Sequence, residues 1–168
     1  MTPFVLMIAG PNGSGKSTLT NYLRKQRVDL GTYINPDEIA ASLPASSPYP
    51  IRVATAQREA DRLRDACLTE RRSFAFETVM SHPNKIEVFQ RARARGFRTL
   101  LYFVGVENPQ INVSRVALRV SQGGHDVPTD RIIARYHRTM ANLFAAARLA
   151  DVAWIFDNSQ VTCLLTRP

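Results

Sequence analysis

The stretch FVLMIAGPNGSGKST, residues 4–18, decides the fold of this chain. It runs from an apolar segment typical of a buried strand, through a glycine-rich turn, into a helical pattern. The turn matches G-x-x-x-x-G-K-[ST], in which backbone N–H groups surround a phosphate and the following helix N-terminus adds a favourable dipole. In such a loop Lys16 would reach the β- and γ-phosphate oxygens and Ser17 a magnesium ion. The stretch therefore predicts a phosphate-binding loop (P-loop) for a nucleoside triphosphate, which we take to be ATP with Mg²⁺.

The residues expected to contact ATP come mainly from this loop. Asn158 joins them because it follows the last apolar run, and in many doubly wound sheets that strand ends beside the P-loop; a simple turn is the alternative for this residue. The expected ATP-binding residues are Gly10, Pro11, Asn12, Gly13, Ser14, Gly15, Lys16, Ser17, Thr18 and Asn158.

Length and composition indicate one globular domain over residues 1–168. Of the 168 residues, 45% are hydrophobic and 21% charged, which suits a single buried core and not a disordered chain. The apolar run at residues 4–9 is far shorter than the ~20 residues of a membrane span, and no basic segment precedes it. We therefore expect a cytoplasmic protein with no membrane partner.

The two cysteines argue against a disulfide-linked or metal-binding protein, and the distribution of charge argues against a nucleic-acid-binding one. Cys67 and Cys163 are too few and too far apart for a disulfide framework or a metal site, and the apolar spacing before Cys67 predicts a core position. The net charge is +8, but the arginines are spread along the whole chain. Solvated helix faces or a polyphosphate site explain them better than nucleic acid, which is the least favoured partner.

Apolar runs alternate with helical patterns, which favours parallel strands joined by helices. We predict an α/β fold, a single doubly wound P-loop domain with a mostly parallel five-stranded sheet, helices on both faces and a small helical lid at about residues 115–135. Right-handed crossovers would place all strand-to-helix loops at one sheet edge. The predicted strands are 4–9, 32–35, 74–79, 99–105 and 152–156, with 161–165 as a further edge strand. The predicted helices are 16–26, 36–43, 52–71, 84–95, 109–120 and 130–149.

Polar residues follow the second predicted strand. Asn35 and Asp37 would face the phosphoryl acceptor, and Asp37 could take the proton of an attacking hydroxyl as a general base. The alternative is that Asp37 only stabilises the first turn of the next helix, which is the favoured interpretation for Glu38.

The third predicted strand, FAFETV, ends in two polar residues that a buried parallel strand would not carry without use. Glu77 could hold Mg²⁺ through water or orient the acceptor, and Thr78 could hydrogen-bond the acceptor. Exposure of a strand end is the competing explanation. The expected metal residues are thus Ser17 and Glu77, and the expected substrate residues Asn35, Asp37, Glu77 and Thr78.

Arginines flank a Gly-Gly turn in the predicted lid. Arg119 comes before the turn, and Arg131, Arg135 and Arg138 follow it on a polar stripe of the next helix. Lid closure would bring guanidinium groups to the γ-phosphate and exclude water. A solvated arginine face is the alternative, favoured for Arg138. The expected catalytic residues are Lys16, Asp37, Arg119, Arg131 and Arg135. Trp154, on the last strand, is expected in the core.

The motifs GPNGSGKST, INPDEIA, FAFETVM, RVALRVSQGGHDVP, RYHR and FDNS together resemble the zeta-toxin family of P-loop kinases, the group often labelled predicted ABC-type ATPases. The resemblance implies ATP- and Mg²⁺-dependent phosphorylation of the 3'-hydroxyl of the amino sugar in UDP-N-acetylglucosamine, and an antitoxin protein as a partner. It also implies that Asp37 is the base, that Glu77 and Thr78 lie on the substrate side, and that Arg119 with Arg131 or Arg135 forms the lid.

We therefore expect a small-molecule kinase whose first candidate acceptor is UDP-N-acetylglucosamine. No N-K-x-D motif of GTPases is present, and Ser121-Gln122-Gly123-Gly124 only faintly resembles an ABC signature. An ATPase or nucleotide-binding module that acts on a partner protein is the alternative.

Overall fold

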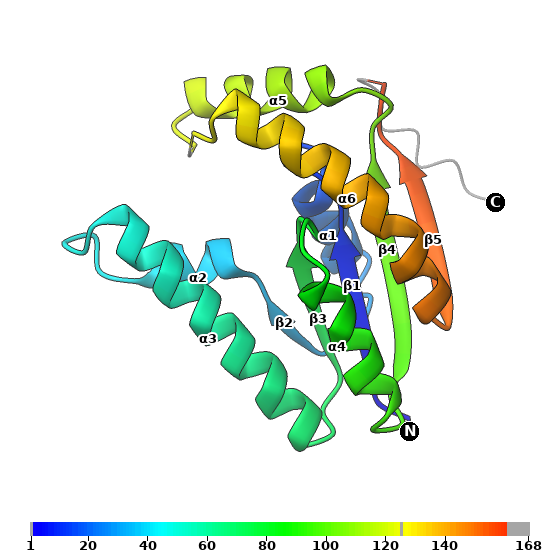
Figure 1. The fold of residues 1–168 in the computed structure, drawn as a ribbon. Coiled ribbons are helices and arrows are strands. Elements are labelled where there is room, and N and C mark those ends of the chain that lie inside the picture. The colour runs from blue at the N-terminus through cyan, green and yellow to red at the C-terminus, as the bar shows by residue number, and fades with distance from the viewer. Residues whose placement is uncertain (1, 125, 161–168) are drawn as a thin grey trace.

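The computed structural model describes residues 2–124 and 126–160 and contains one parallel five-stranded sheet with six helices (Figure 1). The strands are β1 (Phe4–Ala9), β2 (Thr32–Ile34), β3 (Phe74–Thr78), β4 (Arg98–Gly105) and β5 (Val152–Asp157). The helices are α1 (Lys16–Lys25), α2 (Pro36–Ser42), α3 (Tyr49–Thr69), α4 (Asn84–Arg93), α5 (Pro109–Ser121) and α6 (Thr129–Leu149). The predicted α/β architecture is confirmed. The suggested strand at 161–165, with Cys163, lies outside the described residues.

The strand order is β2-β3-β1-β4-β5, and every neighbouring pair is parallel. All carboxyl ends of the strands therefore lie at one edge, as parallel strands joined by crossovers require. β3 lies between β1 and β2, so the strand before Asp37 is not the direct neighbour of the strand before the P-loop. The terminal residue pair of β1 and β3, Ala9 and Thr78, is in register.

The side chains of β1 alternate between two apolar clusters. Val5 and Met7 join the cluster of α3, α4 and α6, whereas Leu6 and Ile8 pack with Leu19 and Leu23 of α1. Figure 1 shows the same division, with α1 behind the sheet and the other three in front. Helices thus cover both faces, as predicted. Cys67 is fully buried, also as predicted.

Two sequence expectations need correction. Trp154 was expected in the core but is 43% exposed. It lies on β5, the edge strand of the sheet. The helix that covers this sheet face is α1, which packs against β1 and not against β5. Its ring instead meets the Tyr102 ring edge-on, with 4.9 Å between the ring centroids.

α3 begins at Tyr49, three residues earlier than predicted. Pro50 falls in the first turn of this helix, where a proline without an N–H is tolerated.

None of the helices in the two described ranges is long and apolar enough to cross a membrane.

Candidate active site

The P-loop connects β1 to α1 through closely packed glycines. A side chain at Gly10 would collide with the carbonyl oxygen of Val104, and the Gly10 N–H donates to the Thr78 carbonyl at 3.3 Å. Gly15 precedes α1 with φ +102°, a conformation that L side chains rarely adopt. The loop thus lies between β3 and β4 with its backbone fixed on both sides.

Lys16 folds back over the loop. Its Nζ donates to the carbonyl oxygens of Gly10 and Pro11, both at 2.8 Å. Burial lowers the pKa of the amine to about 8, the nearby carboxylates of Glu77 and Asp37 act in the opposite direction, and the charge of Arg119 lowers it further. The charges of Glu77, Asp37 and Arg119 thus act on the same amine, at the carboxyl edge of the sheet.

Glu77 is the buried polar centre of the site, 8% exposed at the end of β3. Its carboxylate accepts hydrogen bonds from the hydroxyls of Ser17 at 3.1 Å, Thr20 at 2.7 Å and Tyr33 at 2.6 Å. Strand-end exposure is therefore not its role. Sequence reasoning missed Thr20 and Tyr33; Thr20 stands one helical turn after Ser17, and that spacing could have indicated it.

The Ser17–Glu77 pair fits a magnesium ion bound with ATP. A hydroxyl oxygen and one carboxylate match the hard oxygen ligands of Mg²⁺, which commonly takes one or two protein groups together with phosphates and water. Within residues 2–124 and 126–160, no group of three or more His, Cys, Asp or Glu side chains could hold a metal by itself. The donor set thus suits a metal that arrives with the nucleotide.

Asp37 lies in the first turn of α2. The cap of that helix is Asn35, whose Oδ1 accepts from the Asp37 N–H at 2.9 Å, and Pro36 follows the cap. The Asp37 carboxylate is exposed and does not make the capping bond. Glu38 pairs with Arg24 of α1 at 3.3 Å, a surface contact with a structural role. The cap is therefore Asn35, and Asp37 holds the first-turn position in which a negative side chain stabilises a helix, as the alternative interpretation expected.

Thr78 holds the turn after β3. Its hydroxyl accepts from the Met80 N–H at 3.0 Å, and Met80 has φ +57°. The hydroxyl proton of Thr78 is not used in this bond, so it is available to donate to a ligand.

Two asparagines from distant segments support the P-loop backbone. Asn158 donates from Nδ2 to the Ser14 carbonyl at 2.8 Å, which places it beside the loop as predicted. Asn112 of α5, fully buried, donates from Nδ2 to the Asn12 carbonyl at 2.5 Å. Sequence reasoning missed Asn112, which looks like any polar residue of an amphipathic helix.

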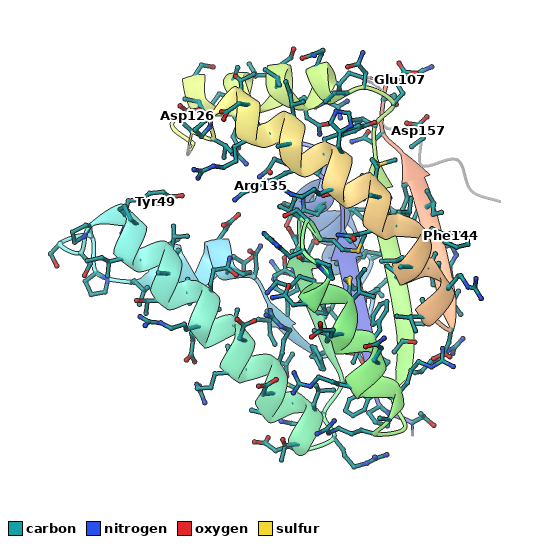
Figure 2. All side chains as sticks on the ribbon, in the orientation of Figure 1. Tyr49, Glu107, Asp126, Arg135, Phe144 and Asp157 are labelled. Atoms are coloured by element: carbon teal, nitrogen blue, oxygen red, sulfur yellow. The ribbon has the colours of Figure 1, made fainter. Side chains whose placement is uncertain are left out.

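The arginines of α5 and α6 differ in their surroundings. Arg119 lies close enough to oppose protonation of Lys16. Burial, together with the charges of Arg131 and Arg138, lowers the pKa of Arg135, so these three guanidinium groups form one positive cluster. In Figure 2 Arg135 leaves α6 on the side that faces Tyr49 at the start of α3.

The middle of α6 is anchored and does not belong to a lid. Thr139 donates to the Val79 carbonyl at 2.7 Å, and Asn142 donates to the Met80 carbonyl at 2.9 Å. Tyr136 donates to the Val106 carbonyl at 2.9 Å. The predicted lid at about residues 115–135 thus ends before this anchored part of α6.

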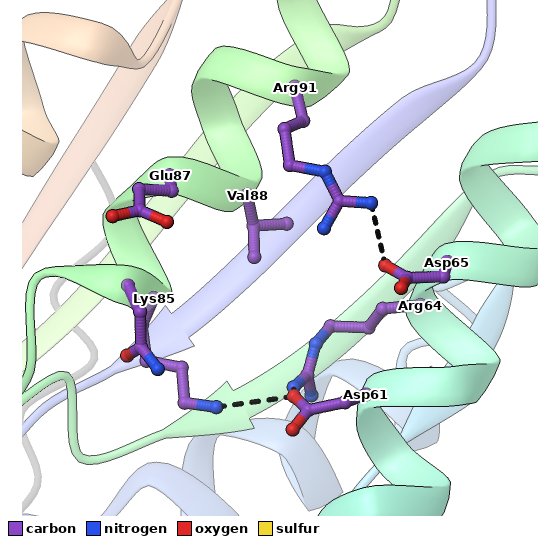
Figure 3. A pocket seen from close by; sticks show the side chains of 8 residues that line it. Asp61, Arg64, Asp65, Lys85, Glu87, Val88 and Arg91 are labelled. Carbon is purple, nitrogen blue, oxygen red and sulfur yellow. Dashed lines mark hydrogen bonds and ion pairs between the residues drawn. The ribbon is translucent and has the colours of Figure 1, made fainter.

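A cavity of about 240 Å³ lies elsewhere, between α3 and α4 (Figure 3). Two ion pairs cross it, Lys85 with Asp61 and Arg91 with Asp65. Arg64, 4% exposed, also pairs with Asp61. Its cations have carboxylate partners and none of its lining residues comes from the P-loop, so this cavity is a helix-to-helix contact and not the reaction site.

The parallel sheet, with a P-loop between β1 and α1, is the fold of P-loop phosphotransferases that use ATP. The family of zeta toxins matches residues 1–167, and the chain belongs to that family.

The chain is similar to one curated protein in sequence and to several solved structures in fold. An uncharacterized protein of Haemophilus influenzae is 31% identical over 131 residues, which cover 78% of this chain and 91% of the relative. A structure from the PezAT toxin–antitoxin system of Streptococcus pneumoniae has TM-score 0.69 and 14% identity, covering 94% of this chain and 69% of that one. The complex AvrRxo1-ORF1:-ORF2 with ATP has TM-score 0.69 and 16% identity, covering 88% of this chain and 50% of that one. At these identities the structures support the fold, which they share with this chain.

Proposed function

We propose that this enzyme transfers the γ-phosphoryl group of ATP to a hydroxyl of a small molecule, and that UDP-N-acetylglucosamine is the first candidate acceptor. The observation that carries the proposal is that Ser17 of the P-loop helix contacts Glu77 at the end of β3, while Asp37 follows the neighbouring strand β2 at the same sheet edge. The Asp37 carboxylate is exposed and follows β2, on the side of Glu77 away from the P-loop. An acceptor hydroxyl bound between Asp37 and the P-loop would find its base there. An ATPase would use such a carboxylate on water, so the identity of the acceptor separates the two functions.

The residues would divide the work by position. Lys16 would leave the Gly10 and Pro11 carbonyls and bind the β- and γ-phosphate oxygens, and Arg119 with Arg131 or Arg135 would neutralise charge as it develops. Ser17 and Glu77 would hold Mg²⁺, which when bound supplies charge neutralisation at the phosphates. Asp37 would accept the proton of the acceptor hydroxyl, and Asn35 and Thr78 would orient the acceptor. Asn158 would lie near the nucleotide base.

The acceptor test is direct. Purified protein with ATP and Mg²⁺ is incubated with a panel of nucleotide sugars and nucleosides, and mass spectrometry follows the gain of one phosphate. Phosphorylated UDP-N-acetylglucosamine supports the full proposal, and another phosphorylated acceptor supports the kinase but not the substrate. ADP and free phosphate alone would favour an ATPase that acts on a partner protein.

We also propose an antitoxin protein as a partner in the cytoplasm. The support is family membership and the similarity to a toxin–antitoxin system protein. We expect the chain to co-purify with the product of a neighbouring gene. We also expect the chain in that complex to lose its binding of ATP.

A further inference from the structure

Tyr33 of β2 joins the two carboxylate-bearing parts of the site through one hydroxyl. Its OH donates to Oε1 of Glu77 at 2.6 Å and accepts from Nδ2 of Asn35 at 3.1 Å. Asn35 in turn accepts from the Asp37 N–H at 2.9 Å. A continuous hydrogen-bond chain therefore runs from the turn that carries Asp37 to the strand end that carries Glu77.

The Tyr33 ring is also held in place from outside. The guanidinium of Arg24, on α1, lies 4.1 Å from the ring centroid, and Arg24 pairs with Glu38 of α2 at 3.3 Å. Cation–π contacts of this kind favour one ring position even at partly exposed sites. Tyr33 thus contacts α1 through Arg24 and β3 through Glu77, and it reaches α2 through the cap residue Asn35. These three elements carry Ser17, Glu77 and Asp37.

We propose that Tyr33 is a positioning residue that fixes the Glu77 carboxylate and the Asn35-Pro36-Asp37 turn in one mutual geometry. The inference rests on the proposed function, because it assigns Glu77 and Asp37 to the same reaction. A phenol has one proton, and here that proton goes to Glu77, so only its oxygen lone pairs can face Asn35. The chain of donors therefore has a fixed direction, from Asn35 through Tyr33 to Glu77.

One substitution can remove this hydroxyl while the aromatic ring stays. Phenylalanine at this position would fill the same space and lose both hydrogen bonds.

The test compares Tyr33→Phe with Tyr102→Phe, a control in a half-buried tyrosine of β4 that meets Trp154 and Phe156 through its ring. We expect Tyr33→Phe to lower kcat about 10- to 100-fold, since small misplacements of catalytic groups cost that much, with KM for ATP nearly unchanged. Binding of Mn²⁺ in the presence of ADP, followed by electron paramagnetic resonance, should weaken about 5-fold, the size of one lost hydrogen bond. Tyr102→Phe should change neither value.

A second variant separates positioning from folding. Asn35→Ser keeps a good helix cap but removes the amide that donates to Tyr33. We expect it to lower kcat while Mn²⁺ binding with ADP stays near the wild-type value, because the Tyr33–Glu77 bond survives. Wild-type kcat in this variant would overturn the link to Asp37.

Wild-type kcat and Mn²⁺ affinity in Tyr33→Phe would overturn the whole inference. The same would follow if Tyr102→Phe lost as much kcat as Tyr33→Phe, because the effect would then be a general loss of packing. If the wild-type protein phosphorylates no acceptor, the proposed function fails, and the Mn²⁺ measurement still decides whether Tyr33 positions Glu77.

Discussion

The Ser17 hydroxyl donates to Oε2 of Glu77 at 3.1 Å, although the two residues are 60 positions apart in the chain. The contact exists because β3 pairs directly with β1, so the end of β3 lies beside the first turn of α1. We propose that this serine and this carboxylate hold the metal that arrives with ATP. Asp37 follows β2, which lies on the side of β3 away from β1 and the P-loop.

Replacing Glu77 with Gln should make the enzyme depend on much higher Mg²⁺ concentrations. The amide keeps the shape but loses the charge that attracts the cation, and its NH₂ group faces hydroxyl donors. We expect kcat at limiting Mg²⁺ to fall about 100-fold or more. The measurement is initial rate against Mg²⁺ concentration at saturating ATP, and an unchanged curve would remove Glu77 from the metal site.

ATP affinity should fall as the pH rises through the pKa of Lys16. Burial lowers that pKa to about 8 in the absence of ATP, and the protonated amine is the form that binds phosphate. The amine is about nine-tenths protonated at pH 7 and about one-tenth at pH 9, so affinity should drop about 10-fold over this interval. Calorimetry should also detect proton uptake on ATP binding near pH 8.5.

Lys16→Arg provides the control for this prediction, because arginine keeps its charge throughout the interval. Its ATP affinity, whatever its value at pH 7, should not show the same fall. A wild-type affinity that stays constant from pH 7 to 9 would mean that the amine is not the group that binds phosphate.

Arg119→Ala should reduce turnover far more than Arg138→Ala. Arg119 affects the Lys16 amine, so its charge lies near the place where the γ-phosphate would bind. We expect a loss of about 100- to 1,000-fold in kcat, typical for removal of one group that stabilises transition-state charge, and less than about 3-fold for Arg138→Ala. Equal effects would indicate that both arginines only contribute to the general positive field.

The helices and strands could be predicted from the sequence, and so could the two parts of the site whose residues are unusual for their place in the chain. A carboxylate at the end of an apolar strand indicated Glu77, and the glycine-rich turn indicated the P-loop. Thr20, Tyr33 and Asn112 were missed because their roles come from partners 57, 44 and 100 positions away. Helical spacing after Ser17 could have indicated Thr20. Spacing along the chain does not reveal strand order, so the contacts of Tyr33 and Asn112 and the exposed edge position of Trp154 could not be predicted.

The central claim is that Asp37 acts as the base on an acceptor beside the P-loop, and Asp37→Asn tests it most directly. The amide retains the backbone contact to Asn35 and the exposed position, so ATP affinity should stay within about 2-fold of wild type. The rate at which phosphorylated acceptor forms should fall about 100-fold or more, the usual contribution of a general base. Turnover equal to that of the wild-type protein would contradict the account and leave Asp37 as a first-turn residue of α2.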